Sequence, residues 1–582
     1  MEGLKMISQI KRLCCVFTFA CVSFSGQAHE HPPGFAVASA STYATKAGMA
    51  ILKQGGNAFD AAIAVTSVLA VTEPYHSGLG GGGVWLLYDA QKQKNILVDG
   101  RESAPGAASK SMYLDSQGKV ISELSLFGPL ASAIPGEPAA IAHIAKKYGK
   151  LPLYKTLAPA IQLAKSGFEV DEHYRSMILN KRVMQHIKGY PSTAKIFLVK
   201  DKIPKVGDLI VQQDLAYTLE QLAKFGRNGF YQGKVAEKLV SEVRKSGGIW
   251  SLGDLKNYKV IERAPLEGEY RGTKVITTPP PSAGGIALLT MLNVLDDYDL
   301  QDIKQAERTH LIVESMRLAY WDRSEFLGDP QFVKIPLKQL LSSAHAKRLR
   351  KHIKPDKATL SSELAQKENS FEDTSENTTH FSIIDQQGNR VAATLSINFL
   401  FGSSFVADGT GVLLHHQMDD FTVKPGEKNV FGLVGGEANQ IAANKRPLSS
   451  MAPTFLINKE RIAVLGTPGG SRIPTMLLLS TLAFVDEKGP LSFVSLPRFH
   501  HQYLPDVLQY ESDAFNKRIR AKLTKMGYRL HKIRSDYGGP RLYYGDMQGL
   551  EWNRKNDTLL AASDPRNIGL AEVHYLLKTN NS

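Results

Sequence analysis

The sequence predicts an α+β protein, because helical and β-type stretches occupy different parts of the chain. An Ala-rich stretch with helical periodicity runs from Thr45 to Val71, and a mostly helical region covers roughly residues 150–350. Two pairs of β-type runs lie at 84–100 and 380–398, each pair joined by a polar turn. With 582 residues, of which 43% are hydrophobic, the chain can fill one large layered core or several structural units.

Residues 1–28 have the composition of a cleaved secretory signal. Basic residues precede a twelve-residue apolar run from Leu13 to Phe24, and small residues follow. A membrane anchor is one alternative, but this run is well short of the roughly 20 residues that cross a bilayer. A lipid anchor on Cys21 is another, although the residues before it fit such a site poorly. We expect an exported protein, periplasmic or extracellular, without stable membrane insertion.

All three cysteines, Cys14, Cys15 and Cys21, lie inside this predicted signal. The processed chain would then form no disulfide and no thiolate metal site, and it would have no cysteine nucleophile. Covalent catalysis would have to use an oxygen or nitrogen nucleophile.

The net charge of +14, which leaves +12 on residues 29–582, raises the possibility of nucleic-acid binding. The densest basic run, residues 347–354, stops at Pro355 and is typical of a helix C-terminus. Because no aromatic platform is interleaved with it, we expect a solvated helix end and no nucleic-acid partner.

The first helical stretch should be two helices in series, since Gly55-Gly56-Asn57 interrupts it. Gly78 to Gly83 then satisfy the pattern G-x-G-x-x-G, but a dinucleotide site needs a strand before the glycines and a helix after them. Here the order is helix, glycines, strand. We expect a closely packed loop and no nucleotide cofactor. A further β-prone stretch near 258–277 ends at three prolines.

Residues 358–377 are polar, acidic and turn-rich, and predict an exposed, mobile arm. A β-hairpin with its turn at Gln387-Gly388-Asn389 follows at once. The junction Asn377-Thr378-Thr379 therefore lies where an arm that is easily cut meets a buried strand. Composition alone does not choose between the two threonines.

Several residues could bind an amino-acid-like ligand. Arg101, at the end of a β-run, could clamp a carboxylate, although taken alone an ion pair with Glu102 or another acid is favoured. In the segment from His415 to Asp420, metal ligation is the minority reading, because consecutive strand residues point to opposite faces. Asp420 suits an ammonium group at least as well. Ser449-Ser450 and Gly469-Gly470 could supply hydroxyl and backbone N–H donors.

Nine segments together resemble the γ-glutamyltransferase (γ-glutamyltranspeptidase) family over nearly the whole chain after residue 28. In order they are HSGLGGGG (76–83), DGRESAP (99–105), PGEP (135–138), GRNGFYQG (226–233), PPPSAGG (279–285), NTTHFSIID (377–385), HHQMDDF (415–421), KRPLSSMAPT (445–454) and TPGGSR (467–472).

The resemblance implies an N-terminal-nucleophile fold, a four-layer αββα sandwich. It also implies self-cleavage before Thr378 into a large subunit, residues 29–377, and a small catalytic subunit, residues 378–582, which form a heterodimer. Thr378 would then attack glutathione or another γ-glutamyl donor, and water or an amino acid or dipeptide acceptor would resolve the acyl-enzyme. A terminal threonine can use its own amine, of pKa about 8, as the base for its hydroxyl. No metal and no cofactor are implied.

The resemblance also assigns the other site residues. Arg101 with Ser449 and Ser450 would hold the α-carboxylate; Asn398, Gln417 and Asp420 would receive the α-amino group; and Gly469 with Gly470 would form the oxyanion hole. Three departures stand out. Ser396 replaces a threonine beside the nucleophile, His415-His416 replace paired asparagines, and Phe431 replaces a tyrosine in the lid-like segment 424–436. A hydrogen-bonded latch from residue 431 to Asn398 is therefore not expected.

Two other functions compete with this reading. A cephalosporin or glutaryl acylase on the same scaffold would share Thr378 but needs no ammonium grip. A secreted amino-acid-binding protein would hold the same ligands without cleaving itself or them.

Overall fold

The computed structural model describes residues 29–364, 378–533 and 544–576. The predicted signal, its cysteines, Asn377 and residues 365–377 of the predicted arm lie outside these ranges. Within them, no helix combines the length and the apolar character needed to cross a membrane.

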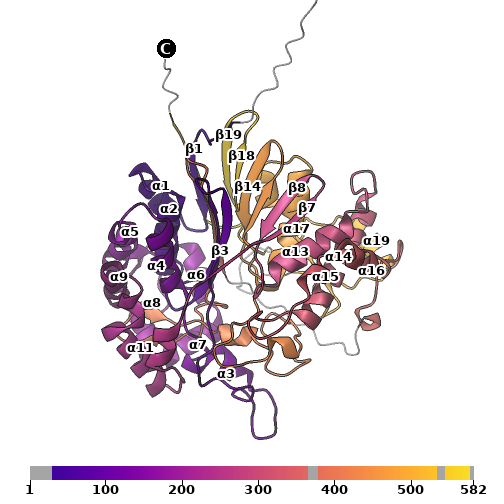
Figure 1. Ribbon diagram of the computed structural model, residues 1–582. Coiled ribbons are helices and arrows are strands. Elements are labelled where there is room, and N and C mark those ends of the chain that lie inside the picture. Colours follow the sequence, from indigo (N-terminus) through magenta and orange to yellow (C-terminus); the bar gives the residue numbers. More distant parts are fainter. Residues whose placement is uncertain (1–28, 365–377, 534–543, 577–582) are drawn as a thin grey trace, which may run out of the picture.

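Mixed α/β architecture with antiparallel sheets is confirmed (Figure 1). The larger sheet has the strand order β20-β1-β9-β10-β2-β3-β6. These strands are β1 Gly34–Ser39, β2 Gly82–Asp89, β3 Lys94–Gly100, β6 Ile261–Arg263, β9 Thr379–Ile384, β10 Arg390–Ser396 and β20 Leu570–Tyr575.

The second sheet has the order β19-β18-β14-β13-β8-β7. Its strands are β7 Leu266–Tyr270, β8 Thr273–Thr277, β13 Thr454–Ile457, β14 Arg461–Gly466, β18 Gln548–Asn553 and β19 Thr558–Ser563. The smaller sheets contain β4 Phe168–Glu169, β5 Leu209–Ile210, β11 Val406–Ala407, β12 Val412–Leu413, β15 Phe499–His500, β16 Leu508–Tyr510 and β17 Leu530–Lys532.

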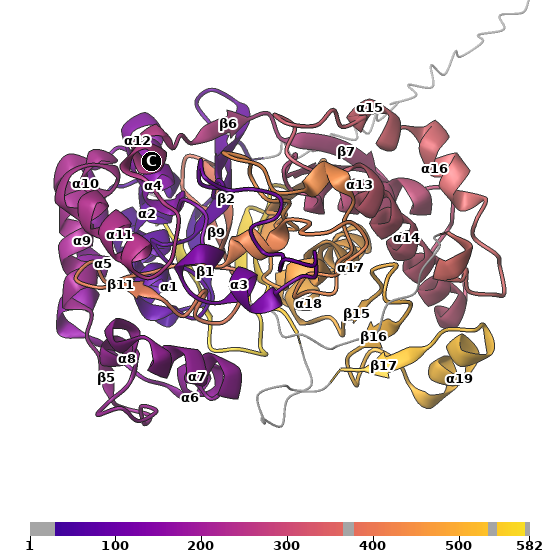
Figure 2. The same ribbon diagram turned by 90° about the horizontal axis from the view of Figure 1, so that it is seen from below.

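The helices gather in two groups on opposite sides of the paired sheets (Figures 1 and 2). The first group contains α1 Thr42–Lys53, α2 Ala58–Thr72, α3 Ser122–Leu126, α4 Glu137–Tyr148, α5 Leu153–Ser166, α6 Glu172–Ile178, α7 Lys181–Gly189, α8 Pro191–Phe197, α9 Gln213–Phe225, α10 Asn228–Tyr231, α11 Gly233–Lys245 and α12 Leu252–Asn257. The second contains α13 Gly284–Leu295, α14 Gln305–Phe326, α15 Leu337–Leu340, α16 Ser343–Arg350, α17 Ile473–Val485, α18 Pro490–Ser495 and α19 Lys517–Lys525.

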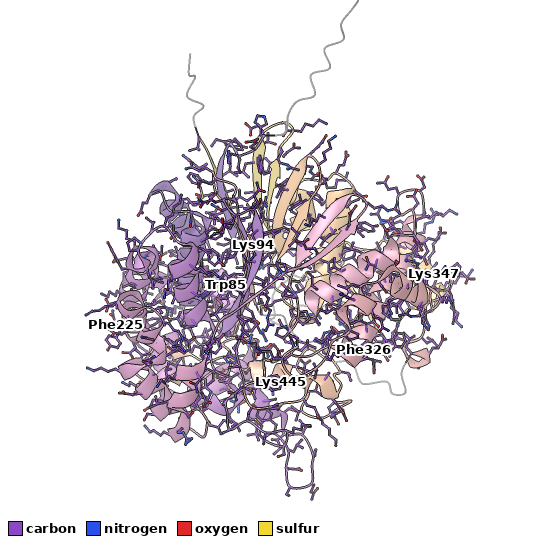
Figure 3. The ribbon with its side chains drawn as sticks, in the orientation of Figure 1. Trp85, Lys94, Phe225, Phe326, Lys347 and Lys445 are labelled. Carbon is purple, nitrogen blue, oxygen red and sulfur yellow. The ribbon has the colours of Figure 1, made fainter. Side chains whose placement is uncertain are left out.

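Alternation along the strands of the larger sheet explains why it can pack on both faces. Trp85, which lies deep inside the molecule (Figure 3), packs with Val37 and with residues of α2 and α4. The neighbouring Val84 and Leu86 belong instead to the core shared with the second sheet, α13, α14 and α17. Successive side chains of a strand point to opposite faces, so one sheet contributes to both cores.

Most strand and helix predictions are confirmed, although the strand assumed for residues 415–420 is not. The hairpin at 380–398 is β9 with β10, and Asp385 accepts hydrogen bonds from the turn at Gln387 (2.9 Å) and Asn389 (3.0 Å). The first helical stretch is α1 and α2, and Asn57 caps α2. The basic run closes α16, where Lys347 lies exposed at the periphery (Figure 3).

The predicted arm is wrong in its first part. Ala358, Thr359 and Ser361 are buried rather than exposed. Ser361 donates to the Tyr503 carbonyl (2.6 Å), and its backbone N–H donates to Asp506 (2.8 Å). Polar composition does not require exposure when the fold supplies partners for each polar group.

Candidate active site

Thr378 lies at the entrance of β9, buried with 4% of its surface exposed. Its Oγ1 is 3.2 Å from the hydroxyl of Ser396, the last residue of β10. The Ser396 hydroxyl in turn accepts the backbone N–H of Asn398 (2.9 Å). The hairpin register pairs Thr379 with Leu395, which sets Thr378 and Ser396 side by side at the open end of the hairpin.

A cavity with about 350 Å³ of empty space lies in front of Thr378. It brings together every site residue predicted from the sequence except Gly469, whose neighbour Gly470 is present. Its walls are formed by Arg101, Arg323, Thr378, Ser396, Asn398, Gln417, Asp420, Phe431, Leu433, Leu448, Ser449, Ser450, Met451, Gly470 and Ile473.

Arg101 is both an ion-pair partner and a wall of this cavity, so the two alternatives for it coexist. It is 2% exposed. Its Nε is 3.2 Å from Glu102, and its Nη2 donates to Asp420 at 3.1 Å. The side-chain amide of Gln417 lies against both charges: with its nitrogen facing Glu102 (2.8 Å), its oxygen accepts from Arg101 (3.1 Å). Three residues predicted to touch substrate thus form one buried network.

Burial of this network shifts its carboxyl groups toward the neutral form. Burial raises the pKa of Glu102 to about 7, although the neighbouring Arg101 opposes the shift. Burial also raises the pKa of Asp420, again against Arg101. The cavity presents the Arg101 guanidinium beside the Asp420 carboxyl group, a pair that suits the carboxylate and ammonium groups of an amino acid.

The segment from His415 to Asp420 does not form the strand assumed for it. Gln417–Asp420 is a turn of 3-10 helix. Within the described residues, no cluster of three or more His, Asp or Glu side chains could hold a metal. Burial lowers the pKa of His415 to about 3 and that of His416 to about 4. The neutral His415 accepts the Gln417 backbone N–H (2.8 Å) and contacts the Ala133 carbonyl (2.8 Å), so it positions Gln417.

The paired serines are fixed by the loop that contains the three prolines. The backbone N–H of Ser449 donates to the Pro281 carbonyl (3.0 Å), and the Ala283 N–H donates to the Ser449 carbonyl (2.8 Å). The Ser449 hydroxyl accepts the Met451 N–H at 3.1 Å. These bonds hold Ser449 at the cavity wall, which Ser450 also lines.

Gly469 and Gly470 form the turn that leads into α17, with φ angles of 139° and 50°. Their N–H groups lie at the start of a helical segment, where backbone donors gather and negative charge is favoured. Phe431 packs onto this turn: a Cβ on Gly470 would meet its ring at 2.7 Å. Gln502 donates to the Phe431 carbonyl (3.1 Å).

We expect Gly470→Ala to lower kcat by about 100-fold, because the added methyl meets the Phe431 ring and the positive φ is strained. Both effects would displace the backbone N–H that is predicted to serve the oxyanion hole. Gly426→Ala is the matched control: it has a φ of 87° and nothing within 4 Å of its Cβ. Steady-state kinetics of both variants would test this. Equal losses of kcat would show that the strain of alanine at a positive φ, and not the contact with Phe431, is responsible.

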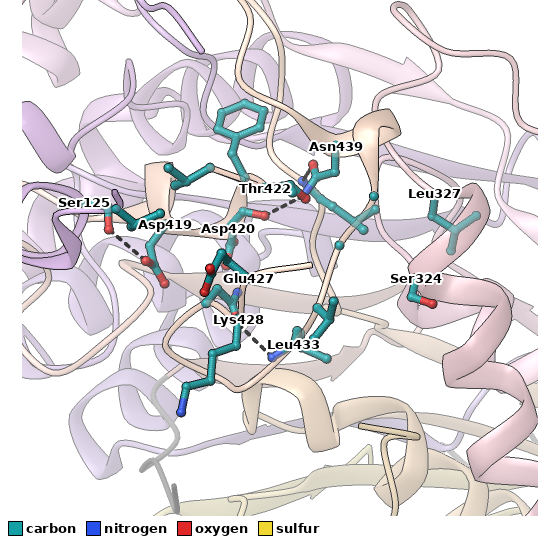
Figure 4. A pocket seen from close by; sticks show the side chains of 18 of the residues that line it. Ser125, Ser324, Leu327, Asp419, Asp420, Thr422, Glu427, Lys428, Leu433 and Asn439 are labelled. Atoms are coloured by element: carbon teal, nitrogen blue, oxygen red, sulfur yellow. Dashed lines mark hydrogen bonds between the residues drawn. The ribbon is translucent and has the colours of Figure 1, made fainter. Parts of the chain in front are cut away.

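Asp419 connects the 3-10 turn to the lid-like segment. It borders a second cavity (Figure 4), in which Ser324 of α14 and Leu327, just after that helix, lie across from Asp419 and Asp420. Its carboxyl accepts the Ser125 hydroxyl (2.9 Å) and the Val430 backbone N–H (2.9 Å). Burial raises the pKa of Asp419 from 3.8 to about 7.

This pKa makes stability depend on pH. The unfolded chain ionises Asp419 near 3.8 and the folded chain only near 7, so between these values the folded state holds the extra proton. Stability should therefore fall as the pH rises from about 4 to about 7, by about 4 kcal/mol relative to Asp419→Asn. Urea unfolding of both proteins at about pH 5 and about pH 8 measures this, and a pH-independent difference would contradict it.

Arg323, on α14, is a cavity residue that the sequence did not point to. It lies in a helix of ordinary composition, inside none of the nine recognised segments. Only the packing of α14 against the site brings it to the same wall as Asp420.

Comparison with known proteins matches residues 44–574 to the family described as Gamma-glutamyltranspeptidase. The "Glutathione hydrolase proenzyme" of Escherichia coli (strain K12) is 40% identical over 542 residues, covering 91% of this chain and 90% of that protein. Among solved structures, a cephalosporin acylase from Bacillus halodurans superposes with a TM-score of 0.80 at 25% identity, covering 97% of this chain and 99% of that one. The Helicobacter pylori gamma-glutamyltranspeptidase matches with a TM-score of 0.54 at 39% identity, covering 57% of this chain and 97% of that one.

Proposed function

The chain belongs to the gamma-glutamyltranspeptidase family, and from this premise we propose that Thr378 is the nucleophile with which it cleaves γ-glutamyl amides. It is an enzyme of the glutathione hydrolase and γ-glutamyltransferase type. One observation carries the assignment of its site: a single cavity joins Thr378 to a buried arginine and a buried carboxylate, the two charges that an amino acid head group requires.

Maturation comes first. The Thr378 hydroxyl attacks the Asn377 carbonyl carbon, the Asn377–Thr378 amide becomes an ester, and water hydrolyses the ester to leave an Asn377 carboxylate and a Thr378 amine. The products are residues 29–377 and 378–582, of 349 and 205 residues once residues 1–28 have been removed. The Ser396 hydroxyl, 3.2 Å from Oγ1, orients the nucleophile for this step.

The released amine then acts as the base in turnover. It takes the Oγ1 proton as Oγ1 attacks the γ-carbonyl of the donor, and the leaving amine receives that proton as the acyl-threonine forms. Arg101, Ser449 and Ser450 hold the α-carboxylate, and Asn398, Gln417 and Asp420 hold the α-amino group. The backbone N–H groups of Gly469 and Gly470 stabilise the oxyanion. Water, an amino acid or a dipeptide resolves the acyl-enzyme.

Further expectations belong to the same proposal. Residues 1–28 direct export to the periplasm or the medium, and the two subunits remain together as a heterodimer. The four-layer αββα arrangement is supported by two helix groups that flank paired sheets with a shared core. The lid-like segment 424–436 is held by Phe431 packing on Gly470 and by Asp419, so its closure needs no latch to Asn398.

The alternative of a cephalosporin acylase is favoured by one comparison: the Bacillus halodurans acylase superposes on this structure over almost the whole chain. Two observations favour a γ-glutamyl donor instead. The sequence identity to the acylase, 25%, is lower than the 40% to the glutathione hydrolase proenzyme, and Asp420 is proposed to bind an ammonium group that a glutaryl amide lacks. The deciding experiment compares L-γ-glutamyl-p-nitroanilide with glutaryl-p-nitroanilide, which keeps the terminal carboxylate and lacks only the α-amino group. We expect hydrolysis of the first only; activity restricted to the second would refute the proposal. Binding of glutamate by a protein that stays one intact chain would identify a binding protein instead.

A further inference from the structure

We propose that Arg323 binds the α-carboxylate of the γ-glutamyl donor and shares that anion with Arg101. This inference rests on the proposed function. It adds to the site a residue from α14, in the large subunit, and makes Arg323 a determinant of specificity for donors with an unmodified α-carboxylate.

The first argument is that Arg323 is buried without a partner. It is 7% exposed, and its Nε has no hydrogen-bond partner among the described residues. No ion pair of Arg323 occurs in the described parts of the chain either. A buried guanidinium without an anion is costly, and burial accordingly lowers its pKa. An incoming carboxylate would remove this cost. Binding of the carboxylate should therefore be more favourable beside Arg323 than beside a cation that already has an ion-pair partner.

The other arginines of α14 show that this is not a general property of the helix. Arg317, which is 1% exposed, pairs with Glu314 (3.4 Å) and Asp506 (2.5 Å). Arg308 pairs with Asp486 at 2.8 Å. Arg101, which also lines the cavity, already contacts Glu102 and Asp420. Arg323 is thus the cavity cation that has no ion pair within the described structure, although Asp420 acts on it at longer range.

The second argument is position. Tyr320 lies one turn before Arg323, and its hydroxyl donates to the Ser471 carbonyl in the turn that follows Gly470. Residues three apart on a helix share a face, so the face that anchors α14 to this turn also presents Arg323 to the site. Arg323 lines the cavity of Thr378 and also the second cavity behind Asp420.

Charge balance identifies the ligand. Asp420 is influenced by both Arg101 and Arg323, and the proposed function assigns it the donor's α-ammonium group. Once Asp420 takes this ammonium, Arg101 keeps Glu102 as its partner, whereas Arg323 loses the carboxylate that acts on it. The α-carboxylate, on the same carbon as the ammonium, is the anion that the donor brings to this end of the cavity.

The test compares two donors that differ only at this group: L-γ-glutamyl-p-nitroanilide and its α-carboxamide analogue. For Arg323→Gln we expect kcat/KM with the carboxylate donor to fall about tenfold or more, mainly through KM, while the value with the carboxamide donor changes by about twofold or less. Arg323→Lys keeps the positive charge but not the planar guanidinium, so its kcat/KM with the carboxylate donor should lie between the values of wild type and Arg323→Gln. Arg308→Gln removes a positive charge from the same helix and should leave both values unchanged.

Equal losses on the two donors would overturn the inference and assign Arg323 a structural role, or one exerted through Asp420 alone. Equal activity of Arg323→Gln and wild type on both donors would also overturn it, while the proposed function would stand. Wild-type protein inactive on any γ-glutamyl donor would instead refute the proposed function. If Arg323→Gln fails to fold, Arg323→Lys is used instead, and the measured quantity is the ratio of its kcat/KM for the carboxylate donor to that for the carboxamide donor. A ratio equal to that of the wild type would show that no guanidinium is needed, which contradicts the inference.

Discussion

Thr378→Ala should leave the protein as a single uncut chain and lower the rate of γ-glutamyl hydrolysis by about 10,000-fold or more. The substitution removes the atom that we propose attacks both the Asn377 carbonyl and the donor, so maturation and turnover should fail together. Denaturing gel electrophoresis measures the first loss and release of p-nitroaniline the second. Thr378→Ser keeps a hydroxyl and should still be cut, more slowly.

The matched control is Thr379→Ala, the next residue of the chain. Thr379 is fully buried on β9, and its hydroxyl has no hydrogen-bond partner among the described residues. It should be processed and active, with the new N-terminus at Thr378. N-terminal sequencing of the smaller fragment identifies the cut, and a fragment that begins at Thr379 would transfer the nucleophile to that residue.

Arg101→Gln should lower kcat/KM by about 100- to 1000-fold, with most of the effect on KM. The variant loses the proposed two-pronged contact to the α-carboxylate, and it leaves Glu102 and Asp420 buried beside each other without their cation. Both carboxyl groups should then take up protons at still higher pH, which weakens the grip on the α-ammonium group. Arg101→Lys restores the charge but not the planar fork, so we expect partial recovery.

Loss of folding must be separated from loss of binding for this variant. Arg317→Gln is the appropriate comparison, because Arg317 is equally buried and also pairs with two carboxylates, Glu314 and Asp506, away from the cavity. It should lower the urea midpoint while the KM of the folded fraction stays near the wild-type value. A similar rise of KM in both variants would show that the Arg101 effect is structural.

Local patterns were sufficient for most of the elements. The alternation at 380–398 and the caps at Asn57 are properties of neighbouring residues, and β9, β10, α1 and α2 follow from them. Burial of Ala358 and Ser361 was not predictable in this way, because their partners, such as Tyr503 and Asp506, lie more than a hundred residues away.

The site also combines features that local motifs predict with features that depend on residues far apart in the sequence. Arg101, Ser449 and Gly470 were found through their motifs, but their convergence on Thr378 depends on how two sheets and their loops pack. His415 was read as a departure of uncertain effect, and only its contacts with Gln417 and Ala133 reveal a supporting role. Arg323 was missed because an arginine on a long helix has no local signature.

The order of strands has a consequence for the life of the mature enzyme. In the larger sheet β1, β2, β3 and β6 precede the proposed cut, and β9, β10 and β20 follow it; β9 lies between β1 and β10. The second sheet is mixed in the same way. Before the cut the two parts find each other within one chain, but afterwards reassembly is a bimolecular reaction that weakens on dilution. Maturation would therefore make unfolding effectively one-way, so the cut enzyme persists by unfolding slowly rather than by refolding.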